Sequence, residues 1–271
     1  MGLVYAGNAG HNPPKWEWIV EYVCTVITSA GTPPPSLNRN PRYSNRVNRP
    51  FYCPSHQQFW NALLGITSDI SVLTTNYDIL VERVLRHRLM RRPPSPGCFY
   101  GGVARPQILK GAAQPFSRWA PERTIEMTGT IPVFKLHGSL NWTLIDQSIV
   151  AFQDTRPVFR HGGTAAIIPP VPEKRVPPWL NQIWKGAEAS LRRSDVWVVC
   201  GYSMPPYDTE VLRLLETAGT GRPLTVFLLD PDCIALKEKW TSLLPQGNII
   251  CLPGLPQGIE ILARHLRLSL A

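Results

Sequence analysis

The sequence contains no long hydrophobic run. Its apolar stretches are short, such as Val196–Cys200, and none approaches the ~20 residues that a helix needs to cross a bilayer. The first residues, Met1–Tyr5, also lack the basic region and apolar stretch of a signal peptide. We therefore expect a soluble cytoplasmic protein with no membrane partner.

Closely paired cysteines are also lacking. The chain has 6 cysteines, but no two of them form a C-x-x-C pair. Structural zinc sites usually combine such pairs, so the sequence predicts no zinc and no other metal site. A disulfide framework is not expected either, because the chain is long and has no secretion signal.

Acidic residues are outnumbered, and the formal net charge is +9. The basic excess is mostly arginine spread along the chain, with its densest patch at Arg83, Arg86, Arg88, Arg91 and Arg92. On a helix most of these side chains would form a solvated face, and the alternative is a phosphate- or nucleic-acid-binding patch. We favour the solvated face and do not expect nucleic acid as a partner.

The composition divides the chain into unequal parts. Residues 1–58 are rich in proline and asparagine, and we predict an irregular N-terminal region with one possible helix at Trp16–Ile27. Residues 59–271 have the composition of one folded domain. Within it, a Pro/Gly-rich segment at about 91–130 is too long for an ordinary connection and indicates an insertion or lid.

Apolar strands alternate with amphipathic helices in the folded part. The expected strands are Ile70–Thr74, Ile131–Leu136, Val196–Cys200, Leu224–Leu229 and Ile249–Leu252. The expected helices are Tyr77–Leu89, Trp179–Leu191, Thr209–Glu216, Cys233–Leu243 and Gln257–Leu268, and residues 162–178 are expected to be irregular. The alternation predicts an α/β fold, a Rossmann-like doubly wound parallel sheet with helices on both faces.

Polar clusters follow four of the predicted strands. They are Thr75–Asp78, His137–Ser139, Gly201–Ser203 and Asp230–Asp232. Open α/β sheets bind ligands beyond the carboxyl ends of their strands, so all four clusters are expected at one rim. Asn and Asp also cap helices at such positions, but four clusters together favour a ligand crevice.

His137 is the most informative of these residues, because it follows a strand directly and precedes a glycine. It either caps the strand or acts at a functional site, and its predicted neighbours Asn76 and Asp78 favour the second interpretation. Asp78 has a helix cap as its alternative role, and Asp208 is expected to cap the helix that follows it. Gly201 and Ser203 fit a tight turn, whether it serves a ligand or only joins a strand to a helix.

Three of these motifs together resemble the SIR2-like family, distant relatives of the sirtuins that often act as NAD-consuming effectors in bacterial anti-phage systems. They are Thr75–Asp78, Lys135–Ser139 and the Gly-Tyr-Ser-Met-Pro-Pro run at 201–206. The resemblance extends from about Phe59 to Ile261, and it implies an NAD-binding domain.

The resemblance implies a role for each matching position. Asn76 would contact the nicotinamide ribose and place the attacking water, Asp78 would hold ribose or nicotinamide-side groups, and His137 would be the general base at a ribose hydroxyl. These three are the candidate catalytic residues. The candidate NAD-binding residues are Thr75, Asn76, Asp78, Gly138, Gly201, Ser203 and Asp230. At Asp230 sirtuins usually have asparagine.

Two departures from the family pattern matter. The sirtuin zinc motifs are absent, which argues against a protein deacylase. The Gly-Ala-Gly-type loop that cradles the NAD pyrophosphate is not evident either. Its nearest equivalent is Ala6–Gly10, with no convincing strand before it. The expectation is that the first strand and its loop are missing from this sequence.

The leading hypothesis is therefore an NAD+ glycohydrolase that produces nicotinamide and ADP-ribose, with NAD as substrate. A pseudoenzyme or binding module for NAD or ADP-ribose is the second hypothesis, and an NAD-dependent deacylase or ADP-ribosyl transferase is the third. Because SIR2-like effectors often act in assemblies, the resemblance also implies a homo-oligomer or a partner effector protein.

Overall fold

The computed structural model describes residues 54–67, 69–89, 98–103, 131–145, 147–151, 164–168 and 175–269. The predicted helix at Trp16–Ile27, the Ala6–Gly10 segment and most of the predicted insertion lie outside these residues. Within the described ranges, no helix is long and apolar enough to span a bilayer.

The first sheet is parallel and carries the first two polar clusters at its rim. Its strands β1 (Val72–Thr74), β2 (Cys98–Tyr100) and β3 (Ile131–Lys135) lie in the order β1-β3-β2. The helices of this part are α2 (Pro54–Leu64) and α3 (Leu80–Leu89). Residues 54–58, which we assigned to the irregular region, are therefore helical, and β2 lies inside the segment predicted as an insertion.

A second sheet, which the sequence did not predict, is antiparallel. It consists of β4 (Gly138–Ile145), β5 (Ser148–Ala151) and β6 (Thr164–Ile167), with β4 in the middle. The expectation that residues 162–178 are irregular was wrong at β6. Strand β4 carries buried Ser139, Asn141 and Thr143 at alternating positions, so it lacks the apolar pattern of a core strand.

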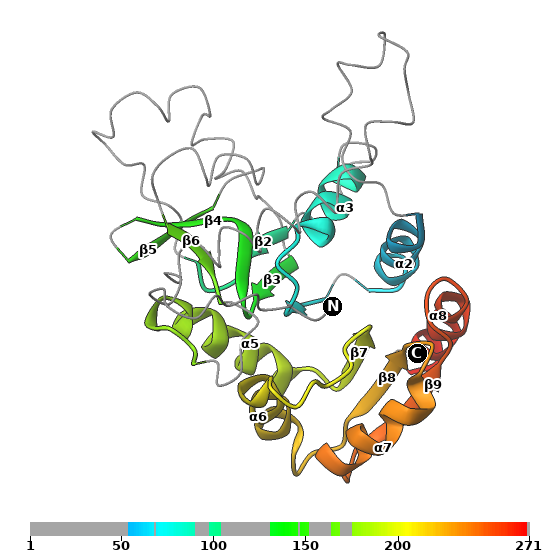
Figure 1. Ribbon diagram of the computed structural model, residues 1–271. Helices are drawn as coiled ribbons and strands as arrows, with labels where there is room; N and C mark the ends of the chain where they lie inside the picture. The colour runs from blue at the N-terminus through cyan, green and yellow to red at the C-terminus, as the bar shows by residue number, and fades with distance from the viewer. Residues whose placement is uncertain are drawn as a thin grey trace, which may run out of the picture.

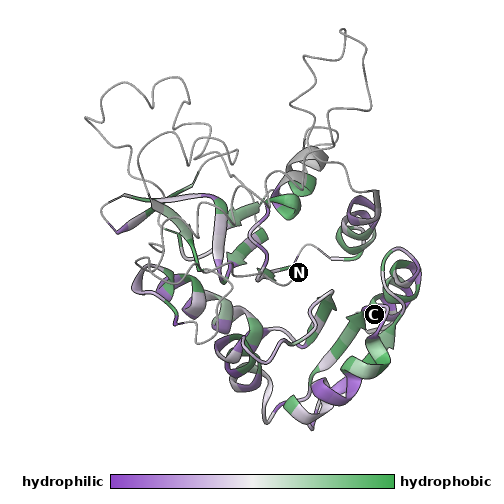
Figure 2. Cartoon of the chain, viewed as in Figure 1, coloured by the Kyte–Doolittle hydropathy of each residue, from purple (hydrophilic) through white to green (hydrophobic). Residues whose placement is uncertain are grey.

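The third sheet is parallel, in the order β7-β8-β9. Its strands are β7 (Val196–Cys200), β8 (Thr225–Leu229) and β9 (Asn248–Leu252). Four of the five β8 residues are buried, and Figure 2 shows the strands of this sheet as mostly hydrophobic. The helical segments in this part of the chain are η3 (Pro178–Leu180), α5 (Asn181–Arg193), α6 (Thr209–Gly219), α7 (Cys233–Leu243) and α8 (Gly258–Ser269), of which α7 and α8 pack against the sheet.

Helix α5 joins the two parallel sheets. It packs against β3 on one side and α6 on the other. In Figure 1 the cyan and green elements therefore lie on one side of α5 and the yellow-to-red sheet on the other. The α/β class and the parallel sheets flanked by helices are confirmed, and the carboxyl ends of β3 and β7 lead toward the same pocket.

Candidate active site

His137 lies in the turn between β3 and β4 and is only 5% exposed. Backbone hydrogen bonds hold this turn on several sides. The His137 carbonyl accepts from the Ile168 amide at 2.8 Å, and the Leu136 amide donates to the Thr74 carbonyl at 2.9 Å. The Trp184 indole of α5 also donates to the Leu136 carbonyl at 3.0 Å. The imidazole is therefore carried by a rigid backbone.

The predicted residue Gly138 is needed for the close approach of β6. Its φ is +81°, and a Cβ atom here would lie 2.0 Å from the Ala166 carbonyl oxygen. No side chain fits such a position, which also has left-handed backbone geometry. The glycine therefore has a structural role, and a contact with NAD remains a prediction.

The first two polar clusters are brought together. Parallel pairing sets Thr74 opposite Lys135, so Thr75 and Asn76 continue beside the turn that carries His137. Asn76 is exposed, and its backbone amide donates a hydrogen bond to Thr74 Oγ1 at 3.1 Å. The Tyr77 ring lies 6.3 Å from the His137 ring, centroid to centroid. Asn76 is thus an accessible residue on the segment beside the turn that carries His137.

The Asp78 side chain acts as a helix cap, which was the alternative role considered for it. Its Oδ1 accepts a hydrogen bond of 2.9 Å from the Leu80 amide, at the first residue of α3. Its backbone carbonyl accepts from Lys135 Nζ. The side chain therefore caps the helix, and the predicted role beside the nicotinamide remains untested.

A buried ion pair lies behind the site. Lys135 Nζ is 3.6 Å from Glu82 Oε1, and the two side chains are only 1% and 2% exposed. Because Lys135 also binds the Asp78 carbonyl, this pair connects β3, α3 and the Asn76 segment.

The third and fourth clusters meet beside each other at the ends of β7 and β8. The register sets Cys200 opposite Leu229, so Gly201 and Asp230 follow at the same level. Gly201 has a φ of +66°, with open space around its missing Cβ among the described residues. Asp230 Oδ1 accepts from the Asp232 amide at 2.9 Å, which stabilises the turn into α7.

Ser203 is exposed, and its carbonyl accepts from Lys239 Nζ at 3.4 Å. Gly201 has the positive φ that suits a tight turn, and the ligand roles predicted for Gly201 and Ser203 remain predictions. None of Gly201, Ser203 and Asp230 lines the pocket beside His137.

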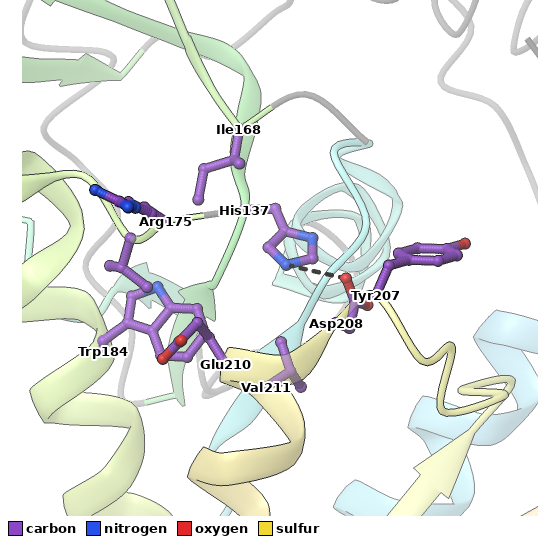
Figure 3. A pocket seen from close by; sticks show the side chains of 9 residues that line it. His137, Ile168, Arg175, Trp184, Tyr207, Asp208, Glu210 and Val211 are labelled. Carbon is purple, nitrogen blue, oxygen red and sulfur yellow. Dashed lines mark ion pairs between the residues drawn. The ribbon is translucent and has the colours of Figure 1, made fainter. Parts of the chain in front are cut away.

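That pocket is a small hollow between the β3–β4 turn, α5 and the start of α6 (Figure 3). Its lining residues are His137, Ile168, Arg175, Val176, Trp184, Tyr207, Asp208, Glu210 and Val211. Of these, only His137 was predicted as a site residue.

Asp208 is the most important residue that the sequence analysis missed. It occupies the N-cap position of α6, as predicted, but its side chain makes no capping hydrogen bond. Instead, its Oδ1 lies 3.9 Å from His137 Nε2. The spacing of eight residues between the end of β7 and Asp208 gave no signal of this contact, because an aspartate before a helix ordinarily indicates a cap.

The phenol of Tyr202 is affected by burial and by the charge of Asp208. Burial, followed by the negative charges of Asp208 and Tyr207, raises the pKa of Tyr202 well above its usual value. The Tyr202 hydroxyl is buried and has no hydrogen-bond partner among the described residues. Tyr202 is therefore held as a neutral phenol beside the pocket.

Metal chemistry has no evident ligand set in the described part of the chain. No group of three or more His, Cys, Asp or Glu side chains there is placed to hold a metal ion.

No protein-family model and no curated protein matches the chain. Among solved structures, it is similar to a triple mutant of a Sir2 homologue in complex with 2′-O-acetyl ADP ribose. The identity is 17%, the match covers 80% of this chain and 68% of that chain, and the TM-score is 0.41.

Proposed function

We propose that this chain is an NAD+ glycohydrolase that cleaves the nicotinamide–ribose bond to give nicotinamide and ADP-ribose. One observation carries the proposal: a buried imidazole, His137, is paired with a carboxylate at a pocket wall and has the exposed amide Asn76 on the neighbouring segment. The motif resemblance assigns the same two residues to this reaction.

The chemistry suits these groups. Cleavage passes through an oxocarbenium-like state, as glycoside cleavage does. His137 accepts a proton from a ribose hydroxyl, which stabilises the positive charge that develops on the sugar. As the C–N bond breaks, its electron pair neutralises the pyridinium ring, so the departing nicotinamide needs no acid. Asn76 places the water whose oxygen bonds to the anomeric carbon, one proton leaves to solvent, and His137 returns its own proton to the hydroxyl.

His137 fixes where the reacting end of the dinucleotide must lie. We place the nicotinamide and its ribose at the mouth of the pocket beside His137, and the remainder of NAD along the rim toward Gly201, Ser203 and Asp230.

A binding module without turnover is the second candidate. The observation that favours it is that Asp78 and Asp230 use side-chain oxygens to stabilise turns. Such a protein would bind NAD or ADP-ribose at the same rim and release no nicotinamide.

Binding and turnover test the proposal together. Calorimetry with NAD+ should show weaker binding in Asn76→Ala and His137→Ala than in the wild type, and nicotinamide release should be lost in both. Glu238→Ala, on the exposed face of α7, serves as the control and should match the wild type. Binding without nicotinamide release in the wild type would favour the binding module, and no binding would contradict both candidates.

Anti-phage defence is the biological setting that we propose for this activity. Cells that express the wild-type chain should lose NAD during phage infection, and cells that express His137→Ala should keep it. An equal NAD level in both would argue against this setting.

A further inference from the structure

Asp208 has an unusual environment for a residue that begins a helix. It is 6% exposed, although both neighbours in the chain, Tyr207 and Thr209, are exposed. An aspartate at this position normally turns its carboxylate to the first free amides of the helix. Here α6 receives no side-chain cap, and the carboxylate faces the imidazole of His137 (Figure 3).

Burial makes this contact significant. The His137 and Asp208 side chains are only 6% and 5% exposed. A buried carboxylate is strongly unfavourable without a partner of opposite charge or hydrogen bonds. Protonated His137 supplies such a charge at 3.9 Å, and neutral His137 does not. A proton taken up by His137 would therefore lie beside a negative charge in a water-poor setting.

Other charged and titratable groups near His137 differ in position. Arg175, Tyr207 and Glu210 also line the pocket. In Figure 3 the Arg175 and Tyr207 side chains point away from the imidazole, and the ion pair is drawn only to Asp208. Tyr77, the ring on the β1 side, lies 6.3 Å away between centroids.

We propose that Asp208 is a positioning residue, which orients the His137 imidazole and stabilises the imidazolium that forms when His137 accepts the ribose proton. This inference rests on the proposed function for its catalytic consequence, but the His137–Asp208 pairing can be tested without NAD. Its role differs from that of a helix cap, because it depends on the charge of the side chain.

The first test is an NMR titration of His137 in the full chain, with its imidazole signal assigned by its loss in His137→Gln. Asp208→Asn keeps the side-chain size and removes the charge, so the titration midpoint should move to lower pH. Glu216→Gln makes the same charge change on the exposed part of α6 and should leave the midpoint in place. A midpoint unchanged in Asp208→Asn would overturn the proposal.

The second test is the pH profile of nicotinamide release. In Asp208→Asn, kcat should fall about tenfold with little change in KM, and the midpoint of the profile should shift with the NMR titration. Asp208→Glu retains the carboxylate and should restore part of both values, which a purely structural role would not do. An equal loss in Asp208→Glu and Asp208→Asn would contradict a role for the charge.

The two tests separate the two claims. A wild type without turnover would contradict the proposed function, and the NMR titration would still decide whether the charge of Asp208 sets the titration midpoint of His137. If Asp208→Asn does not fold, Asp208→Glu still decides, because a displaced carboxylate should move the His137 midpoint and a spectator carboxylate should not.

Discussion

The two parallel sheets differ in what they bury. Around β7, β8 and β9, the core is made of apolar side chains, and from residue 175 to residue 269 the buried polar residues are Ser190 and Asp208. Around β3 and β4, by contrast, the buried polar residues are Glu82, Lys135, His137, Ser139, Asn141 and Thr143. The stability of the first region therefore depends on close packing of apolar side chains, and that of the second on specific hydrogen bonds and ion pairs. Substitutions that conserve volume should therefore distinguish them.

Lys135→Met should have the largest effect on stability. The two side chains are similar in size, but the substitution leaves Glu82 buried without its cation. Breaking a buried pair in this way costs about 3–5 kcal/mol, whereas Leu228→Met in β8 should cost less than about 1.5 kcal/mol. Urea unfolding measures both.

A double variant provides the control for this comparison. Glu82→Leu combined with Lys135→Met removes both charges and should recover most of the lost stability, because apolar replacements of a buried pair are often neutral. Equal costs for Lys135→Met and Leu228→Met would show that the two regions do not differ.

Gly138→Ala and Gly201→Ala compare two glycines with positive φ. At Gly138 the added methyl would meet the Ala166 carbonyl, but at Gly201 it would meet open space. We expect a loss of about 2–4 kcal/mol at Gly138, from overpacking and backbone strain together, and about 1 kcal/mol at Gly201 from strain alone. Thermal or urea unfolding of the two variants gives the ranking, and a reversed ranking would contradict the close approach of β6.

Asn141→Leu should have an intermediate effect. The Asn141 amide accepts from Ser139 Oγ at 2.7 Å and donates to the Tyr100 hydroxyl at 2.9 Å, inside the core. The substitution puts an apolar side chain of similar size in place of the amide, so that both hydroxyls lose this buried partner, at a cost of about 1–3 kcal/mol. Wild-type stability by urea unfolding would show that this network does not contribute.

Tyr202→Phe should have the smallest effect and the opposite sign. Its hydroxyl is buried without a hydrogen-bond partner in the described part of the chain, so its removal should stabilise the fold by up to about 1 kcal/mol. Because burial raises the Tyr202 pKa in the folded state, the wild type should lose stability as the pH rises above ~10, where the unfolded chain releases this proton. Urea unfolding at neutral and alkaline pH should show a smaller loss in the variant.

The same contrast explains how much the sequence predicted. The strands β7, β8 and β9 lie within one residue of their predicted bounds, because buried parallel strands are continuous apolar runs. Strand β4 was missed because buried Ser139, Asn141 and Thr143 interrupt that pattern. Their hydrogen-bond partners include residues distant in the sequence, such as Tyr100, and a local sequence pattern does not indicate such partners.

The candidate site was predicted only in part, for a related reason. His137 was found because it follows a strand, and that position alone indicated the rim of the sheet. Asp208 was assigned to a helix cap, since the same residue type in the same place usually has that role. Its contact with His137 depends on how α6 packs beside the β3–β4 turn, and local sequence contains no record of that packing.

The Lys135–Glu82 pair also has a consequence for how the chain folds. If β3 paired with β1 one residue out of register, every β3 side chain would turn to the opposite face. An apolar strand loses little by such a slip between two buried faces. In β3, however, the slip would carry Lys135 away from Glu82 and the Asp78 carbonyl and leave an ammonium group in the core. The Lys135–Glu82 pair therefore makes misaligned pairings of the strand that leads to His137 unfavourable in free energy, and this effect does not require a bound ligand.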